Sequence, residues 1–420
     1  MNQALLDFIS RCPTAYHTAA QVAARLEAAG FAPLQEGEKW DLTPGKGYYV
    51  TRNGSSLIAF RAPEGEGGFM IAAAHGDSPS FKVKENPELP GDNGLRLSVE
   101  KYGGMLCAPW LDRPLSLAGR AVVRTGTGVE SRLIDFYQPV ALIPTVAIHM
   151  NRKANEGMSY DAAVDMLPLY GGQPGTLRAR AAALAGVEEP DLLAWDLYLY
   201  PTAPGTVWGE YVSAPRLDDL QCVFAALTAF LQAKPRAVPV LAVFDNEEVG
   251  SRTKQGAAST LLSDVLRRIC GGEEEYRRRL ADSLMLSCDN AHAVHPNHPE
   301  YADKNHTVRM NGGVVIKYNA NQHYTSDGVS AALFRLICRE AGVPVQLYAN
   351  RADMPGGSTL GNIADATVSV NTVDIGLAQL AMHSCYETAG AADTAYMAAA
   401  LTAFFGKRLQ AERDGRYTLL

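Results

Sequence analysis

The chain has 420 residues, of which 47% are hydrophobic and 20% are charged. This is the composition of a folded globular protein, and it excludes a disordered, collagenous or coiled-coil chain. Lysine and arginine total 38 against 45 acidic residues, so the formal net charge is −7, and we expect neither a nucleic-acid-binding protein nor one that binds membranes.

The start of the chain and its cysteines favour the same compartment. Residues 1–17 lack a basic segment followed by an apolar one, so we expect no secretory signal, and no apolar run approaches the roughly 20 residues that span a bilayer. The seven cysteines are scattered without a C-x-x-C pair, which favours reduced thiols over a disulfide framework. We therefore expect a cytoplasmic protein.

The first part of the chain predicts two helices followed by strands. Apolar residues recur at helical spacing up to Gly30. The pair Asn53-Gly54 separates two strand-like runs, KGYYVTR and SSLIAFRA, and is typical of a tight hairpin turn. The run GFMIAAA, which is followed by His75, is apolar throughout and predicts a strand buried on both faces.

The pattern changes between residues 89 and 206. Proline and glycine turns interrupt short strand-like runs such as LRLSVEKYG, RAVVRTGT and VALIPTVAIHM, and one alanine-rich stretch is helix-like. After Trp208, apolar strand candidates alternate with helices, which favours a mainly parallel sheet covered by helices. We expect an α/β fold with a mostly parallel central sheet, formed by residues 1–88 and 207–420 and interrupted by a β-rich insert at 89–206.

Five side chains able to bind a metal lie near the ends of these predicted elements. His75, Glu248, Asp289 and His383 follow apolar runs, and Asp218 begins a predicted helix. Ligands of open α/β sheets bind outside the carboxyl ends of strands, so several of these side chains are expected at one edge. Two imidazoles with three carboxylates suit zinc better than magnesium or calcium. Five ligands can hold two metals through one bridging carboxylate, and a water between the metals would become a hydroxide nucleophile near neutral pH.

Glu247 and Glu248 form a carboxylate pair after the run VPVLAVFDN. Neighbouring side chains on an extended segment point in opposite directions, so one acid can bind metal while the other faces the water as a general base. Two solvated acids in a loop are the alternative. Asp77 can hold the second ring nitrogen of His75, and a turn-forming aspartate explains this position equally well.

At these residues the chain resembles the aspartyl aminopeptidase family of dinuclear zinc exopeptidases, over nearly its whole length. The segments that carry the resemblance are SRCPTAYHTA, HGDSPSFKVK, SAPRLDDL, FDNEEVGS, SCDNAHAVHPN, KYNANQHYTSD, MPGGSTLG and LAMHSCYE. The pair FDNEEVGS and SCDNAHAVHPN is the most specific. The resemblance implies a zinc-exopeptidase fold, an inserted domain that dimerises, and a homo-oligomer that is a dimer or a tetrahedral dodecamer.

The resemblance implies two zinc ions per chain that share the carboxylate of Asp218. The ligands would be His75, Asp218 and Asp289 for one zinc, and Asp218, Glu248 and His383 for the other. The reaction implied is removal of the N-terminal residue from a peptide.

The resemblance also implies roles for three residues that are not ligands. Glu247 would be the general base that passes a proton to the leaving amine, and Asp77 would orient His75. His149, in the insert, would reach the active site of a neighbouring subunit and steady the tetrahedral oxyanion. A histidine with only a structural place in a strand is the alternative for His149.

An acidic N-terminal residue is the expected preference. Lys317 matches the position that would meet an Asp or Glu side chain, and Gly356 and Gly357 fall in a loop that would face the substrate. A strand lysine that extends its ammonium to solvent is the alternative for Lys317. Rival functions are the same chemistry with a neutral or apolar preference, a mononuclear hydrolase such as a deacylase, and a catalytically silent peptide-binding shell.

Three positions depart from the family pattern. Gly76 stands where a small polar residue is usual, Asp219 where asparagine is usual, and Tyr386 where arginine is commoner. None of the three removes a predicted ligand or Glu247, so we expect catalysis to be retained.

Overall fold

The computed structural model describes all residues from Met1 to Leu420, which form two compact units. The first comprises Met1–Asp77, Gly205–Met382 and Glu387–Leu420, and the second comprises Ser78–Pro204 and His383–Tyr386. The boundary expected after residue 88 falls inside the strand β5 (Ser80–Gly91). Because this strand pairs within the second unit, that unit begins before it, at Ser78.

The first unit is built around a nine-stranded sheet. In spatial order its strands are β1 (Ala32–Leu34), β2 (Gly47–Arg52), β3 (Ser56–Arg61), β14 (Val238–Phe244), β4 (Phe69–His75), β15 (Leu284–Cys288), β19 (Asn371–Gly376), β17 (Val314–Tyr318) and β18 (Val345–Ala349). The strands from β14 to β19 run parallel, as expected for the centre. Antiparallel pairs at β2–β3, β3–β14 and β19–β17 make the sheet as a whole mixed.

Local sequence explains two of these strands. All seven residues of β4 are buried, as expected for a continuous apolar run between helix layers. The β2–β3 hairpin turns at Asn53 and Gly54, whose φ angles of 59° and 67° are the left-handed values that a tight hairpin turn requires. Both predictions are confirmed.

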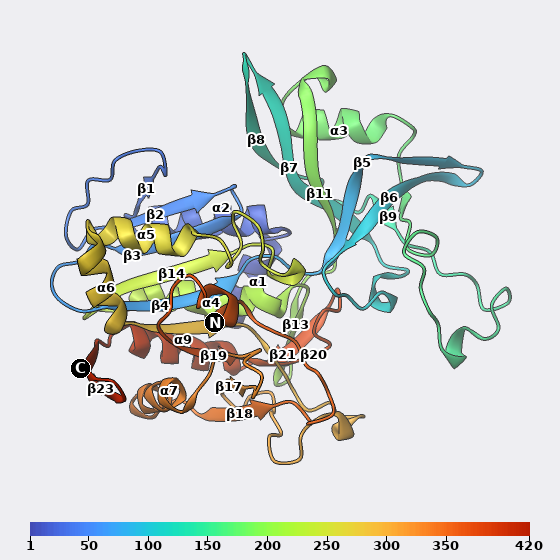
Figure 1. Ribbon diagram of the computed structural model, residues 1–420. Coiled ribbons are helices and arrows are strands. Elements are labelled where there is room, and N and C mark those ends of the chain that lie inside the picture. Colours follow the sequence, from blue (N-terminus) through green and yellow to red (C-terminus); the bar gives the residue numbers. More distant parts are fainter. The chain divides into compact units, whose positions relative to one another are not determined.

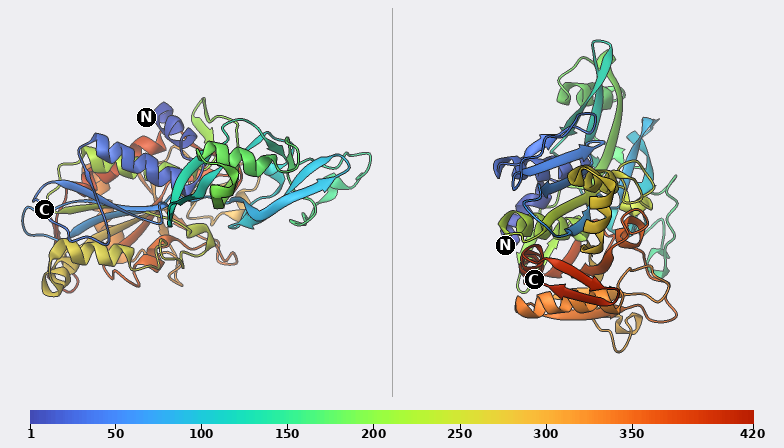
Figure 2. Two further views of the ribbon diagram at one scale, coloured as in Figure 1. Left: turned by 90° about the horizontal axis from the view of Figure 1, so that it is seen from above. Right: turned by 60° about the vertical axis from the view of Figure 1, so that its left-hand side comes forward.

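Helices cover both faces of this sheet, as Figures 1 and 2 show. One face packs against α1 (Asn2–Ser10), α2 (Ala15–Ala28), α4 (Leu217–Gln232), α7 (Gly328–Glu340) and α9 (Asp393–Phe405). The other face packs against α5 (Leu261–Cys270), α6 (Glu273–Ala281) and α8 (Leu360–Ala364). The two faces therefore have separate hydrophobic cores, which hold the strand ends in fixed positions.

A second, smaller sheet of the first unit leads into α4. Its strands, in order, are β12 (Thr206–Trp208), β13 (Tyr211–Ala214), β21 (Glu387–Gly390), β20 (Ala378–Leu380) and β16 (Ala291–His292). β13 leads almost directly into α4, and it pairs with β21. The remaining short elements are the hairpin of β22 (Leu409–Arg413) and β23 (Arg416–Leu419), and the 3₁₀ turns η1 (Ala108–Trp110), η2 (Ala154–Glu156), η3 (Glu189–Asp191), η4 (Glu247–Val249) and η5 (Pro299–Tyr301).

The second unit is β-rich, as expected for the insert, and its sheet closes on itself. The strands in order are β11 (Leu192–Pro201), β5, β6 (Gly94–Tyr102), β10 (Leu169–Tyr170), β9 (Ala141–Leu142), β7 (Leu115–Thr125) and β8 (Gly128–Asp135). β11 pairs with both β5 and β7, so six strands form a ring around their own hydrophobic core. The helix α3 (Thr176–Leu184) is the alanine-rich stretch of the sequence.

The prediction of a strand over the whole run VALIPTVAIHM in the insert is wrong. Of the run VALIPTVAIHM only Ala141 and Leu142 pair in a strand. Pro144 has no N–H to donate to a sheet, and the chain continues as irregular structure into an exposed turn that contains His149. None of the helices of the whole chain combines the length and the apolar character needed to cross a lipid bilayer.

Candidate metal centre

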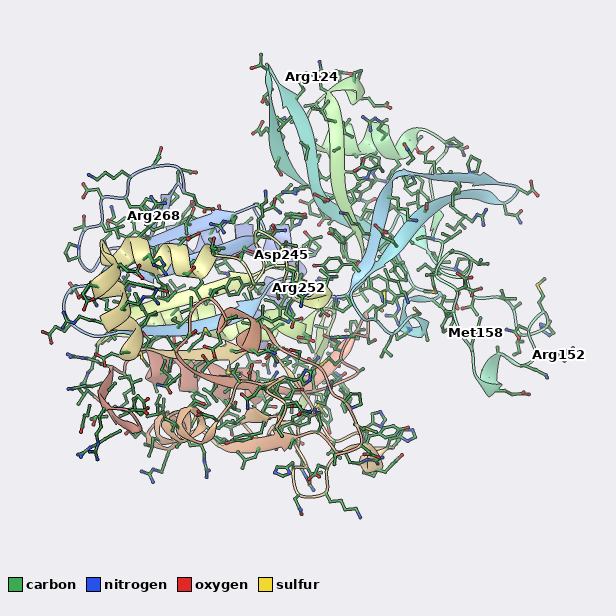
Figure 3. All side chains as sticks on the ribbon, viewed as in Figure 1. Arg124, Arg152, Met158, Asp245, Arg252 and Arg268 are labelled. Carbon is green, nitrogen blue, oxygen red and sulfur yellow. The ribbon has the colours of Figure 1, made fainter.

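The carboxyl ends of three parallel strands bring acidic and imidazole side chains to one edge of the large sheet. His75 is the last residue of β4, Asp289 directly follows β15, and Asp245 directly follows β14, where Figure 3 labels it. β4 pairs in parallel with both β14 and β15, so the three strand ends lie side by side. The predicted gathering of site residues at one edge is confirmed for His75 and Asp289.

Asp218 reaches the same place from the first turn of α4. Asp218 and Asp219 have non-helical backbone angles, and the peptide bond between them is cis. Possible ligand atoms of His75, Asp218, Asp219 and Asp289 all lie within 4.8 Å of one another, and all four residues are buried. The backbone N–H of His75 also donates a hydrogen bond to Asp219 Oδ2, at 3.3 Å.

Glu247 and Glu248 join His75 in a second group whose ligand atoms lie within 4.8 Å of one another. The expectation that this pair lies on an extended segment is wrong. β14 ends at Phe244, and Asn246 turns the chain with a left-handed φ of 61° into the 3₁₀ turn η4, which begins at Glu247. Asparagine tolerates this conformation better than most residues, so Asn246 can turn the chain between the end of β14 and the acidic pair.

Asp77 holds this turn against the strand end. Its carboxylate accepts hydrogen bonds from the backbone N–H groups of Glu247 and Glu248, each at 3.2 Å. Its main-chain carbonyl lies 3.0 Å from His75 Nδ1, and its carboxylate lies 3.5 Å from the same nitrogen. Asp77 therefore touches the imidazole and both glutamates, and the other ring nitrogen of His75 lies 3.5 Å from Asp218 Oδ1.

The acids of the centre destabilise one another's charged forms. Burial, followed by the charges of neighbouring carboxylates, raises the pKa of Glu247 to about 8. The same two causes raise the pKa values of Glu248 and Asp219 well above their ordinary values, and they also raise the pKa of Asp289. A bound cation would relieve the repulsion among these buried carboxylates.

The donor set fits zinc. Zinc is bound in proteins by imidazole nitrogen and carboxylate oxygen, and both are present around His75. Burial by itself lowers the pKa of the His75 imidazole, but hydrogen bonds to Asp218 and Asp77 outweigh burial and raise it. The residues that raise this pKa are the acids that would surround a cation in the same space.

His383 belongs to the short segment 383–386 of the second unit. This segment connects β20 to β21, so it is joined at both ends to the first unit. Glu387, the first residue of β21, accepts a hydrogen bond from the backbone N–H of Asp218 at 3.0 Å. Within its own unit, His383 has a left-handed φ of 66°, and its carbonyl accepts a hydrogen bond from the N–H of Leu106.

The other expected site residues lie in different surroundings. Lys317, on β17, is 2% exposed, and its ammonium donates hydrogen bonds to the main-chain carbonyls of Asp289 at 2.8 Å and Asn290 at 3.3 Å. The lysine does not extend to solvent. Gly356 and Gly357 lie in an exposed loop, in which a side chain at Gly356 would collide with Asn350.

The positions that depart from the family pattern have local partners. A side chain at Gly76 would crowd Thr18, which lies 3.1 Å from the place that a Cβ atom would take. Asp219 accepts the hydrogen bond from His75 described above, and Tyr386 donates its hydroxyl to the carbonyl of Pro204 at 2.7 Å.

Two buried acids of this region were not among the predicted site residues. Asp219 contributes to the first ligand group, and Asp245 is buried beside Asp77, where burial and then the Asp77 charge raise its pKa to about 7. Asp245 could have been predicted, because it directly follows an apolar run, as Asp289 does. Asp219 was noted in the sequence only as a departure from the family pattern beside Asp218, and its hydrogen bond with the His75 N–H was not predicted.

Comparison with known proteins is consistent with this centre. The family described as aminopeptidase I zinc metalloprotease (M18) matches residues 8–405. A probable M18 family aminopeptidase 2 of Ectopseudomonas mendocina is 43% identical over 417 residues, which cover 96% of this chain and 97% of that protein. The protein of the same description from Clostridium novyi is 42% identical over 414 residues, with coverages of 93% and 95%.

Solved structures agree with these relatives. The structure of Ape4 in its complex with Nbr1 has a TM-score of 0.93 and 33% identity, and the match covers 96% of this chain and 85% of that one. The crystal structure of prApe1 has a TM-score of 0.89 and 30% identity, with coverages of 96% and 94%. The chain therefore belongs to the M18 family of zinc metalloproteases, and it is an aminopeptidase, a hydrolase that acts on peptides.

Proposed function

We propose that this chain is a dizinc aminopeptidase that releases the N-terminal residue of peptides, preferably Asp or Glu. The observation that carries the proposal is the buried gathering of His75 with acids from three separate segments, whose ligand atoms lie within 4.8 Å of one another in two overlapping groups. The repulsion among these acids supports a site that holds cations.

Two zinc ions would be held by five residues, with Asp218 shared between them. One zinc would take His75, Asp218 and Asp289, and the other would take Asp218, Glu248 and His383. The hydrogen bond from Asp218 to Glu387, four residues after His383, supports the second set. When bound, the ions would supply Lewis-acid activation of water and of the scissile carbonyl.

Glu247 is the proposed general base, because its carboxylate lies beside His75 without being needed as a ligand. It would take a proton from the attacking water and pass it to the leaving amine. Asp77 would orient His75 and fix the turn that carries Glu247, in keeping with its hydrogen bonds to both.

A neighbouring subunit is proposed to complete the site. His149 lies in an exposed turn of the second unit, which suits a side chain that steadies the oxyanion in another subunit. The second unit would then be a dimerisation domain. The S. cerevisiae mApe1 structure is a dodecamer with a TM-score of 0.84 and 29% identity, and it supports a homo-oligomer, either a dimer or a dodecamer, for this chain.

Lys317, a buried cation beside Asp289, is the residue proposed to bind the acidic side chain of the substrate. Gly356 and Gly357 would form part of the substrate-facing loop. One observation favours the alternative of a neutral or apolar preference. Two of the three N–H groups of Lys317 donate hydrogen bonds to main-chain carbonyls of the protein, and its nitrogen also pairs with the Asp289 carboxylate at 3.6 Å, so its charge already has a partner.

The test is turnover of Glu-, Asp- and Leu-nitroanilides by purified protein, with and without zinc, beside Glu247→Gln and with metal content measured. We expect two zinc ions per chain and chelator-sensitive release that favours Glu and Asp. Glu247→Gln should retain its metal and lose turnover.

Each contrary result identifies a different rival. Preference for Leu would discard the acidic pocket and keep the mechanism. One metal per chain would favour a mononuclear hydrolase. No turnover after zinc is restored would favour a peptide-binding shell.

A further inference from the structure

A buried network of polar side chains lies directly behind the proposed ligands. Asn290, the residue after Asp289, is 2% exposed. The two N–H groups of its Nδ2 are shared among three acceptors, the main-chain carbonyl of Leu217 at 3.1 Å, Gln221 Oε1 at 3.1 Å and Gln379 Oε1 at 2.9 Å. One amide group therefore ties the end of β15 to the start of α4 and to β20.

A second set of hydrogen bonds in this network also connects Asn290 to the first turn of α4. Gln379 Nε2 donates to Glu387 Oε1 at 3.4 Å, and Glu387 Oε2 accepts the backbone N–H of Asp218 at 3.0 Å. Because Leu217 precedes Asp218, the hydrogen bonds form a closed circuit: Asn290 to Leu217 on one side, and Asn290 through Gln379 and Glu387 to Asp218 on the other.

This circuit joins two segments that each carry one acid of the metal centre. The ligand atoms of Asp218 and Asp289 lie within 4.8 Å of each other in a buried space, where like charges repel strongly. Asn290, Gln379 and Glu387 are buried with them, and burying such groups costs free energy unless every one is hydrogen-bonded. Apolar side chains could fill the same volume, so packing alone does not account for a polar circuit at this position.

We infer that Asn290 is a positioning residue, which holds the main chains of Asp218 and Asp289 at the spacing that a shared metal ion requires. The inference rests on the proposed ligand set. Residues that orient metal ligands typically contribute 10- to 100-fold to metal affinity. Loss of the Asn290 amide should therefore weaken zinc binding by about 10- to 100-fold, while the fold is retained.

The test compares Asn290→Ala with Thr394→Val. Thr394 Oγ1 accepts a hydrogen bond from Gln221 Nε2 at 3.0 Å, so this control removes a buried hydrogen bond of the same network on the branch away from Asp218 and Asp289. The measurements are zinc dissociation constants by chelator competition, and the visible spectrum of the cobalt-substituted protein. We expect weaker zinc binding and an altered spectrum for Asn290→Ala, with both unchanged for Thr394→Val.

Zinc affinity of Asn290→Ala within twofold of the parent, with an unchanged cobalt spectrum, would overturn the inference. If Asn290→Ala does not fold, Gln379→Met breaks the circuit at its other arm and must show the same loss. Asp289→Ala separates the two proposals. If it loses one zinc while Asn290→Ala binds normally, only the positioning role fails; if it keeps both, the ligand set itself is wrong.

Discussion

Asp77 touches three residues of the proposed centre without being one of its ligands. Its carboxylate accepts the backbone N–H groups of Glu247 and Glu248, and its carbonyl lies against the ring of His75. Side chains of this kind fix the positions of other functional groups through main-chain hydrogen bonds. The spacing of two residues allowed a contact with His75 or a turn-forming role equally, and the family resemblance implied the contact, whereas the contacts with Glu247 and Glu248 join segments that are distant in the chain.

The proposed acidic preference rests on Lys317, and Lys317→Met tests it. If the ammonium meets an acidic substrate side chain, its loss leaves that charge buried without a partner, which costs about 2–5 kcal/mol. Turnover of Glu-nitroanilide should then fall at least tenfold relative to Leu-nitroanilide. The ratio of the two rates is the readout, because lost contacts with Asp289 would lower both rates together.

The matched control for this experiment is Lys82→Met, which removes a lysine paired with Asp196 at 2.8 Å in the second unit. It should leave the ratio unchanged. An unaltered preference in Lys317→Met would discard the acidic pocket.

His17 provides a prediction about pH. Burial, and then the charge of Arg216, lowers the pKa of its imidazole from 6.5 to about 4. The folded protein thus resists a proton that the unfolded chain accepts near pH 6.5, so this contribution to stability is complete above that pH and is lost as the pH falls towards 4. The loss approaches about 1.4 kcal/mol per pH unit.

The measurement is urea unfolding at pH 7 and pH 5 for the parent and for His17→Gln. The variant, which cannot take up the proton, should lose less stability between the two pH values. Equal losses in both proteins would contradict the assignment to His17.

At the scale of elements, local signals predicted helix surfaces and hairpins. In α6, Glu273 pairs with Arg277 and Glu275 with Arg279, each at 2.7 Å, because residues four apart lie side by side on a helix surface. The 3₁₀ turn at Glu247 was not predicted, because it depends on the conformation of a single residue, Asn246.

The start of α7 carries a complete capping box. Asp327 Oδ1 accepts the N–H groups of Val329 and Ser330 at 2.9 and 2.7 Å, and Ser330 Oγ accepts the N–H of Asp327 at 3.1 Å. Asp327→Ala leaves these helix N–H groups without their side-chain acceptor. We expect a loss of about 1 kcal/mol in the free energy of unfolding, measured as a lower urea midpoint.

Arg335→Ala, on the exposed face of the same helix, is the control, and it should change stability by less than about 0.5 kcal/mol. A similar shift for both variants would mean that the cap contributes nothing beyond general helix stability.

At the scale of the whole molecule, the chain divides into two units with separate cores. The first contains the buried acids, whose repulsion a metal would relieve. Removal of zinc by a chelator should therefore lower the melting temperature measured by calorimetry. A ligand present at a thousandfold above its dissociation constant stabilises by about 4 kcal/mol, and this contribution would be lost.

Glu248→Gln should reduce this effect of the chelator, because it removes one proposed ligand and one buried acid together. Melting temperatures that do not change with chelator in the parent protein would argue against a resident metal in this centre.

By itself the sequence determined the type of most elements and the residue types that gather at one edge of the large sheet. Apolar runs and turn residues are local properties, so β4, the Asn53-Gly54 hairpin and the edge that gathers His75 and Asp289 could all be predicted. The resemblance of motifs across nearly the whole chain supplied the family, which the comparisons confirm.

Only the tertiary structure decided which distant residues meet. The closed ring of the second unit depends on the pairing of β11 with two strands far apart in the chain, and the mixed character of the large sheet depends on where its outer strands join. The contacts of Asp219, Asp245 and Asn290 with the centre likewise cross between segments. Such contacts arise from packing of whole elements, and no local spacing encodes them.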